Sequence, residues 1–348
     1  MTDLPVTMRG VWLIGHGDMD KLDIRQDIPV PVPGPRDVLV RVAAAGINNT
    51  DINTRMAWYS KNDGASEDAS WSGEPLKFPR IQGADVCGHI IAVGREISSD
   101  RIGERVLIEP CIREANGKIL EQPWYFGSEC DGAFAEYTVV AARHAYKIDS
   151  ELSDIELASF PCSYSTAENL LTRADVKPGE RVLVTGASGG VGSAAIQLAK
   201  ARGVFIWAVT SPTKSDALHE LGADETISRE TNLIEVPGSN SVDVVIDLVA
   251  GDKWPQYLEV LRPGGRYAVA GAIAGPLVEL DVRTLYLKDL SLFGCTVLEP
   301  EVFKNLINRI EQGTIKPVVA QSFALEEIRD AQTLFMKKQH VGKIVLRI

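Results

Sequence analysis

The stretch that decides the fold is VLVTGASGGVGSAAIQLAKARG, residues 182–203. It opens on an apolar run that predicts a β-strand ending at Gly186, and it closes on an alanine-rich helical pattern. Four glycines lie between them within seven residues, at positions 186, 189, 190 and 192. Glycine tolerates positive φ and lets backbone N–H groups approach a ligand closely. A helix N-terminus adds unpaired N–H donors and a partial positive charge. The stretch therefore predicts a cradle for the phosphates of a dinucleotide.

The glycine spacing departs from the usual Gly-x-Gly-x-x-Gly fingerprint, because Ser188 stands where the second glycine is expected. A tight strand–helix turn with no ligand is the alternative interpretation, and the strands and helices that surround this turn argue against it. The predicted phosphate-binding set is Gly186, Ser188, Gly189, Gly190, Val191 and Gly192.

The two halves of the chain show different patterns. Residues 8–145 contain short β-like runs separated by glycine and proline, at 37–47, 87–94, 105–110 and 134–140, which predict an all-β unit. Within them, residues 60–75 are polar and rich in Gly and Ser, and we expect an inserted surface loop there. After about residue 150, continuous apolar strands alternate with helical segments. This alternation predicts a parallel sheet with helical crossovers.

The end of the second predicted strand, 204–210, bears on the choice of nucleotide. An NAD site usually places an acidic residue there to bind the ribose 2′-hydroxyl. Here the strand ends at Thr210 and continues as Ser211-Pro-Thr-Lys214, with no acid. Hydroxyl groups and an ammonium group favour a 2′-phosphate. The sequence therefore predicts NADP(H), with Thr210, Ser211 and Lys214 as contacts; the alternative for Lys214 is a solvated surface lysine.

Composition excludes several classes of partner. The 348 residues fit about two domains. The formal net charge is −11 and no dense run of Lys or Arg occurs, which argues against nucleic-acid or anionic-membrane partners. No run of 18 apolar residues occurs in the sequence, so we expect no membrane-spanning helix. The N-terminal residues do not have the pattern of a signal peptide. The five cysteines are scattered and odd in number, so we expect a cytoplasmic protein.

The order and spacing of several segments resemble the medium-chain dehydrogenase/reductase superfamily, in particular its zinc-independent quinone oxidoreductases and enoyl reductases. The segments are AAAGINNTDIN (43–53), FPRIQGADVCGHIIAVG (78–94), GERVLIEP with GAFAEYTVV (103–140), VKPGERVLVTGASGGVGSAAIQLAK (176–200) and HVGKIVL (340–346). The resemblance implies an α/β protein. A GroES-like, β-rich catalytic domain would span 1–155, a Rossmann coenzyme domain with a doubly wound parallel sheet 156–298, and 299–348 would return to the catalytic domain.

The zinc ligands of the superfamily's alcohol dehydrogenases are largely missing. Asn48 replaces the first cysteine and Ala84 replaces the histidine, so only Cys162 matches. A catalytic zinc needs three protein ligands, usually thiolate and imidazole. We therefore expect no metal. A weak site made by Asp85 and Cys162 is the alternative.

Three residues are catalytic candidates through the resemblance: Tyr59, Thr50 and Asn48. In zinc-independent relatives a tyrosine lies eight residues beyond an acid, as Tyr59 lies beyond Asp51 here. A tyrosine hydroxyl can hydrogen-bond a carbonyl oxygen and donate a proton. Thr50 stands at the proton-relay position, and Asn48 could donate to a developing oxyanion. The alternative for Tyr59 is a packing aromatic, and we expect Asp51 to brace the loop.

Three further coenzyme contacts follow from the same resemblance. Lys343 matches a position near the coenzyme phosphates, with a surface lysine as the alternative. Gly271 and Ala272 close a strand beside the expected nicotinamide.

The resemblance also bears on assembly. Residues 290–297 match a segment that pairs across the interface of homodimers in relatives, so we expect a homodimer.

The function predicted is a zinc-independent, NADP(H)-dependent oxidoreductase that passes a hydride to a quinone, enone or related small carbonyl compound. The alternatives are a zinc alcohol dehydrogenase with unusual ligands and a non-catalytic NADPH-binding or sensing protein.

Overall fold

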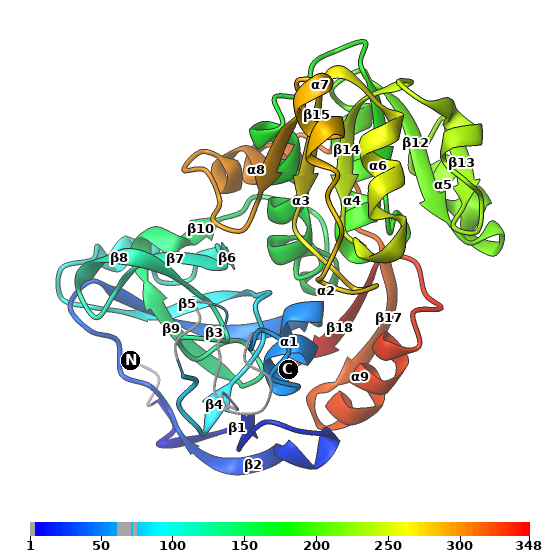
Figure 1. Ribbon diagram of the computed structural model, residues 1–348. Coiled ribbons are helices and arrows are strands. Elements are labelled where there is room, and N and C mark those ends of the chain that lie inside the picture. The colour runs from blue at the N-terminus through cyan, green and yellow to red at the C-terminus, as the bar shows by residue number, and fades with distance from the viewer. Residues whose placement is uncertain (1–3, 61–70, 72–74) are drawn as a thin grey trace. The chain divides into compact units, whose positions relative to one another are not determined.

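The computed structural model describes residues 4–60, 71 and 75–348 (Figure 1). The chain forms two compact units. Unit 1 comprises Met1–Cys162, Val319–Gln339 and Lys343–Ile348, and unit 2 comprises Ser163–Val318 and His340–Gly342. Across the described residues, every helix is too short or too polar to cross a bilayer.

Unit 1 is built on a seven-stranded sheet in the order β10-β6-β5-β3-β18-β17, with β9 also paired to β3. Its strands are β3 (Asp37–Gly46), β5 (Cys87–Val93), β6 (Arg105–Ile108), β9 (Tyr137–Ala141), β10 (Ala145–Lys147), β17 (Val319–Ala324) and β18 (Lys343–Arg347). A three-stranded sheet has the order β2-β1-β4 and a hairpin joins β7 to β8; these strands are β1 (Thr7–Leu13), β2 (Leu22–Pro29), β4 (Arg80–Ile81), β7 (Cys111–Ala115) and β8 (Lys118–Tyr125). The predicted β-rich unit is confirmed. The predicted insertion at 60–75 lies outside the described residues except for Ser60, Trp71 and Pro75.

The β-to-α transitions of unit 1 follow local capping rules. Helix α1 (Asn49–Arg55) comes directly after β3, and the Asp51 carboxylate accepts the Asn48 N–H at 2.8 Å to close its first turn. The sequence SDIELASFPCSYSTAENLL (153–171) has a helical period throughout and predicts one helix, but the structure has two, α2 (Asp154–Leu157) and α3 (Pro161–Arg173). Pro161 has no N–H for a preceding turn, so it begins a new helix. The C-terminal helix of unit 1 is α9 (Ile328–Met336).

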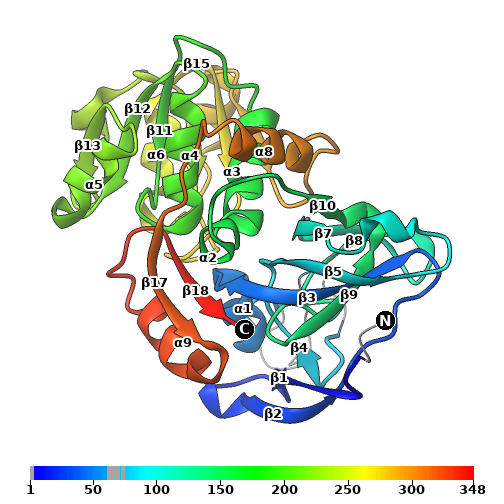
Figure 2. The same cartoon turned by 180° about the vertical axis from the view of Figure 1, so that it is seen from behind.

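Unit 2 contains a six-stranded, all-parallel sheet in the order β13-β12-β11-β14-β15-β16 (Figures 1 and 2). This order is that of a doubly wound Rossmann sheet, whose switch point lies between β11 and β14. The strands are β11 (Arg181–Val184), β12 (Phe205–Thr210), β13 (Glu225–Ser228), β14 (Val242–Asp247), β15 (Leu261–Val269) and β16 (Ser291–Gly294). Helix α3 belongs to this unit from Ser163 onward. The other helices are α4 (Gly190–Lys200), α5 (Ser215–Glu220), α6 (Trp254–Val260), α7 (Val282–Leu287) and α8 (Val302–Glu311), with α4 and α6 on opposite faces of the sheet (Figures 1 and 2). The predicted fold class is confirmed.

The return of the chain to unit 1 begins at Val319, later than the predicted residue 299. The intervening residues are held in unit 2 by specific contacts with α3 and α4. The Asn169 side chain donates to the Val297 carbonyl and accepts the Glu299 N–H, and the Gln197 side chain accepts the Lys316 N–H at 2.8 Å. The amphipathic helix α8 therefore packs with the coenzyme-type fold, and a sequence pattern alone could not assign it to either unit.

Candidate functional site

The glycine turn of unit 2 has the geometry that the sequence predicts. Strand β11 ends at Val184, Gly186 has φ of +56°, and α4 begins after an N-cap at Gly189. A Cβ on Gly192 would lie 2.3 Å from the Gly186 carbonyl oxygen, so helix and turn are in direct backbone contact. The N-terminus of α4 is thereby fixed beside the switch point of the sheet. A dinucleotide phosphate fits such a cradle because the first N–H groups of the helix point outward.

The residues predicted to surround the nucleotide ribose lie at the end of β12. Thr210 is buried, and its hydroxyl oxygen has no partner among the described residues. The Lys214 ammonium donates to Ser188 Oγ at 3.3 Å and to the His340 carbonyl at 2.9 Å. Ser211 and Thr213 share a hydroxyl contact of 3.2 Å. The structure thus brings Lys214 next to Ser188 of the glycine turn.

The sequence reasoning missed Arg229, a second cation in this region. Its backbone N–H donates to the Thr210 carbonyl at 3.0 Å, and its side chain is 73% exposed. Burial and the nearby charge of Arg229 both lower the pKa of Lys214. Two positive groups therefore lie close together at the end of β12. The sequence signal for Arg229 was its position directly after β13 (Glu225–Ser228).

Gly271 and Ala272 follow β15 and border a braced loop that the sequence reasoning also missed. A Cβ on Gly271 would lie 2.9 Å from the Leu248 carbonyl oxygen. That loop starts at the buried Asp247, whose carboxylate accepts hydrogen bonds from Thr185 and Tyr267 hydroxyls, both at 2.5 Å. Asp247 also accepts the backbone N–H groups of residues 249 and 250. This network holds the loop on the Gly271 backbone; its only sequence signal was an acid ending an apolar strand.

In unit 1, Lys343, the first residue of β18, is buried and not at the surface. It is 2% exposed, and its ammonium donates to the Ile47 carbonyl at 2.9 Å, Asn48 Oδ1 at 2.5 Å and Asp85 Oδ2 at 2.7 Å. An ammonium has three N–H donors, so these contacts use all of them. The predicted phosphate contact is corrected accordingly: β18 pairs with β3, and the side chain points into unit 1.

The side chain of Asn48 also forms its hydrogen bonds with residues of unit 1. Besides accepting from Lys343, its amide nitrogen donates to Asp85 Oδ2 at 2.8 Å and, more weakly, to the Gly46 carbonyl at 3.4 Å. The other oxygen of Asp85 accepts the Cys162 N–H at 2.5 Å. Asp85 is therefore the hub of a buried network. The predicted role of Asn48 as a donor to an oxyanion does not match these contacts, because both amide hydrogens already face protein oxygens.

Thr50 and Tyr59 are brought together as hydroxyl partners. Thr50 lies in the first turn of α1, and the Tyr59 hydroxyl donates to Thr50 Oγ1 at 3.2 Å. Burial raises the pKa of Tyr59, while hydrogen bonds to Thr50 and Asn53 act in the opposite direction. The phenol is therefore protonated at neutral pH and can donate a proton. The adjacent carboxylate of Asp51, which accepts Asn48 N–H and Gly83 N–H, braces this loop as expected.

An apolar cluster adjoins the Asp85 network. It contains Ala84, Tyr125 and Cys162, with the Trp71 ring packed against it. The Tyr125 hydroxyl and Cys162 Sγ lie 3.0 Å apart, and the Trp71 and Tyr125 ring centroids are 5.1 Å apart. Burial, together with the charge of Asp85, raises the pKa of the Cys162 thiol to about 12. Cys162 is thus a neutral thiol; no motif in the sequence pointed to Tyr125.

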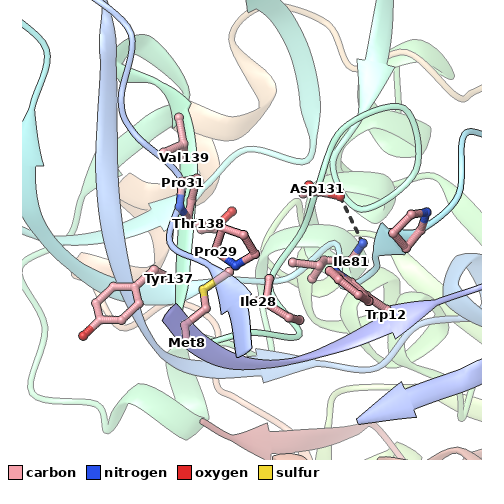
Figure 3. A pocket seen from close by; sticks show the side chains of 11 residues that line it. Met8, Trp12, Ile28, Pro29, Pro31, Ile81, Asp131, Tyr137, Thr138 and Val139 are labelled. Carbon is pink, nitrogen blue, oxygen red and sulfur yellow. Dashed lines mark hydrogen bonds between the residues drawn. The ribbon is translucent and has the colours of Figure 1, made fainter. Parts of the chain in front are cut away.

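A separate pocket of about 390 Å³ opens in unit 1 between β1, β2 and β9 (Figure 3). Its walls include Met8, Trp12, Ile28, Tyr137 and Thr138. Its acidic group, Asp131, is engaged by the Arg80 guanidinium and the Ile81 N–H. The pocket offers apolar surface without a reacting group, and it contains none of the predicted site residues.

Comparison with known proteins assigns the family. Residues 34–150 match the family of alcohol dehydrogenase GroES-like domains, and residues 190–312 match the family described as zinc-binding dehydrogenase. Human quinone oxidoreductase is 31% identical over 353 aligned positions, covering 97% of each chain. The chain belongs to the medium-chain dehydrogenase/reductase superfamily. It is accordingly an oxidoreductase of the kind that uses a nicotinamide coenzyme.

Other members of the superfamily that resemble this chain have different printed activities. An NAD-dependent alcohol dehydrogenase from Sulfurisphaera tokodaii is 29% identical, covering 97% of this chain and 99% of its own. A solved structure from Sinorhizobium meliloti, described provisionally as an alcohol dehydrogenase, is 44% identical with a TM-score of 0.93, covering 100% of this chain and 98% of its own. Membership alone therefore fixes neither the substrate nor the metal.

The residues present do not fit the zinc that the name of one matching family implies. Ala84 offers a methyl group, the Asn48 amide oxygen accepts from the Lys343 ammonium, and Cys162 is a neutral thiol beside Tyr125. Throughout the part of the chain that the structure describes, no three His, Cys, Asp or Glu side chains are grouped to hold a metal ion. A ligand set of amide, methyl and thiol lacks the thiolate and imidazole donors that zinc prefers.

Proposed function

We propose that the protein is a zinc-independent, NADP(H)-dependent oxidoreductase that reduces a quinone, an enone or a related activated carbonyl compound in the cytoplasm. The observation that carries the proposal is the unit 1 network, in which a lysine ammonium lies among the groups that would have to bind a metal. The 31% identity to human quinone oxidoreductase supports the same substrate class.

The preference for NADP(H) rests on charge at the end of β12. Lys214 and Arg229 supply two cations at the end of β12, where Arg229 also lies 3.4 Å from Glu230. The buried Thr210 hydroxyl at this strand end has no partner among the described residues. A 2′-phosphate neutralises such a pair of cations, whereas a bare ribose hydroxyl does not. The glycine turn and the first turn of α4 would hold the pyrophosphate. When bound, the coenzyme supplies the hydride.

The protein groups proposed to act on the substrate are Thr50 and Tyr59. The protonated Tyr59 hydroxyl would donate a hydrogen bond, and then its proton, to the substrate oxygen on which negative charge develops. Thr50 orients that hydroxyl through their 3.2 Å contact and can return a proton to it. Asp51 and Asn48 would position these hydroxyl groups without contacting the substrate, because the hydrogen bond between them holds the start of α1.

We also propose a homodimer. Strand β16 is an edge strand of the unit 2 sheet, and edge strands expose unpaired N–H and C=O groups. Large apolar side chains in the segment that precedes it along the chain are exposed, including Leu277 at 91%, Tyr286 at 59% and Leu287 at 70%. Several exposed apolar groups within one segment favour a protein–protein contact. A small-molecule substrate and a second copy of the chain are the partners that we expect, with no nucleic acid or membrane.

The experiment that tests the activity compares NADPH and NADH with a 1,4-quinone, a 2-alkenal and a simple alcohol, each with and without a chelator. We expect NADPH-dependent reduction of the quinone or the enal that the chelator leaves unchanged. Alcohol oxidation that the chelator abolishes would favour the zinc-dependent alternative. Tight NADPH binding with no turnover on the panel would favour a sensing protein.

The coenzyme preference is tested with Lys214→Ala. Hydrogen bonds to charged groups contribute about 1.5–3 kcal/mol, so the KM for NADPH should rise by roughly 10- to 150-fold while that for NADH changes little. Lys200→Ala is the matched control, because Lys200 lies in the same unit and pairs with Asp224. Equal losses with both coenzymes would show that Lys214 only braces the loop.

A further inference from the structure

Three oxygen atoms of unit 1 converge on one buried point. They are the Ile47 carbonyl oxygen, Asn48 Oδ1 and Asp85 Oδ2, and each lies within 2.9 Å of the Lys343 ammonium nitrogen. Backbone carbonyl, amide and carboxylate oxygens are the ligands preferred by hard divalent cations such as Mg²⁺, Mn²⁺ and Ca²⁺. The geometry is thus that of part of a cation site, and in this chain a side chain of the protein itself fills it.

Burial explains why the point requires a cation. Asp85 is 0% exposed and Lys343 is 2% exposed, so neither charge is solvated by bulk water. A buried carboxylate without a compensating charge is strongly destabilising. Lys343 compensates that charge directly, through an ion pair of 2.7 Å. Asn48 and the Cys162 N–H complete the hydrogen bonding of the carboxylate without adding charge.

We propose that Lys343 is a built-in cation that keeps a divalent metal out of this pocket. The ammonium occupies the point where the three oxygens meet, and its charge repels a second cation. Loss of the ammonium with retention of the oxygens turns the same point into a binding site for a hard divalent cation. The inference deepens the proposed function and rests on its metal independence. It assigns that independence to one residue of β18, in addition to the replaced ligands.

The test uses Mn²⁺ as the probe, because free Mn²⁺ gives an electron paramagnetic resonance signal that is lost on binding. Lys343→Ala and Lys343→Gln remove the charge, and Lys343→Arg is the matched control that retains it. We expect the two neutral variants to bind one Mn²⁺ at least tenfold more tightly than the wild-type chain or Lys343→Arg. Adding Asp85→Asn to Lys343→Ala should remove that binding, since the site then loses its carboxylate.

A variant that does not fold unaided still gives an answer. Each variant is refolded from denaturant with Mn²⁺ or with a chelator, and the recovery of folded protein is compared. Recovery of a neutral variant that depends on Mn²⁺ supports the proposal. The proposal is overturned if a neutral variant binds no Mn²⁺ and its recovery is the same with metal as with chelator. Failure to recover in either condition counts as the same recovery.

The wild-type chain separates this inference from the proposed function. Activity of the wild type that a chelator leaves unchanged, alongside neutral variants that ignore Mn²⁺, would refute the role of Lys343 and leave the proposed function standing. Chelator-sensitive activity of the wild type would refute the proposed function itself. Mn²⁺ binding by the wild type as tight as by Lys343→Ala would also refute the role of Lys343.

Discussion

Replacement of Gly192 by alanine should destabilise unit 2 and weaken coenzyme binding together. The added Cβ would lie 2.3 Å from the Gly186 carbonyl oxygen and 2.6 Å from the Ala187 Cα. Both contacts are with backbone of the tight turn, so no flexible side chain can move away. The helix start and the turn must separate by at least 0.7 Å to bring the nearer contact to 3.0 Å.

The magnitude follows from the cost of overpacking, which is about 1–3 kcal/mol for an added carbon in a well-packed region. For a unit of this size each kcal/mol shifts the melting temperature by about 2–4 °C. We therefore expect the melting temperature to fall by several degrees. The displaced N–H groups of the cradle should raise the Kd for NADPH by about tenfold or more, because each 1.4 kcal/mol is a factor of ten.

Gly189→Ala provides the matched control in the same turn. A Cβ there would lie 3.5 Å from the Gly186 carbonyl oxygen, an ordinary contact, and its φ of −74° suits alanine. Differential scanning calorimetry without coenzyme should show Gly189→Ala within about 0.5 kcal/mol of the wild type. A Gly192→Ala protein that melts with Gly189→Ala, and not below it, would refute the reasoning.

Three other expectations follow. Tyr59→Phe should lower kcat by about 10²-fold or more with little change in KM, whereas Tyr146→Phe should not; an unchanged kcat would remove Tyr59 from catalysis. Burial raises the pKa of Asp51 from 3.8 to about 7. Between these two pH values the folded state holds a proton that the unfolded state has lost. The free energy of unfolding should therefore fall as pH rises from about 4 to 7. Urea titrations of the wild type and Asp51→Asn measure this, and equal slopes in both would contradict it. Leu287→Glu should convert the proposed dimer to a monomer in light scattering, while the control Val32→Glu, at another exposed apolar residue in unit 1, should not; a monomeric wild type would contradict the dimer.

The parts of this molecule that the sequence predicts are those governed by local rules. The glycine turn at 186–192 could be recognised because strand, glycines and helix are contiguous, and backbone sterics leave few alternatives for such a turn. The contact between Thr50 and Tyr59 was not predicted, although it too is local, since it spans nine residues across α1 and the turn that follows it. The split of the expected helix at Pro161 also had a local signal, the missing N–H of proline, which helical periodicity obscured.

The contacts that could not be predicted join segments far apart in the chain. Lys343 and Asp85 are 258 residues apart, and a Gly-Lys pair before an apolar strand has the same sequence pattern whether the lysine faces a phosphate or the interior. Asp247 and Arg229 acquire their roles only when the strands are assembled in the order β13-β12-β11-β14. Tertiary placement, which periodicity does not contain, decides these roles.

The position of β18 has a consequence for biosynthesis. This strand is made long after β3, yet it lies between β3 and β17 inside the seven-stranded sheet. Until the ribosome has made residues 343–347, β3 has an open edge at residues 44–46, where β18 will pair, and Asp85 lacks the ammonium of Lys343. Unpaired edges promote association between chains. A chain that lacks residues 343–347 would therefore be prone to aggregate, although every residue of its coenzyme-type unit is present.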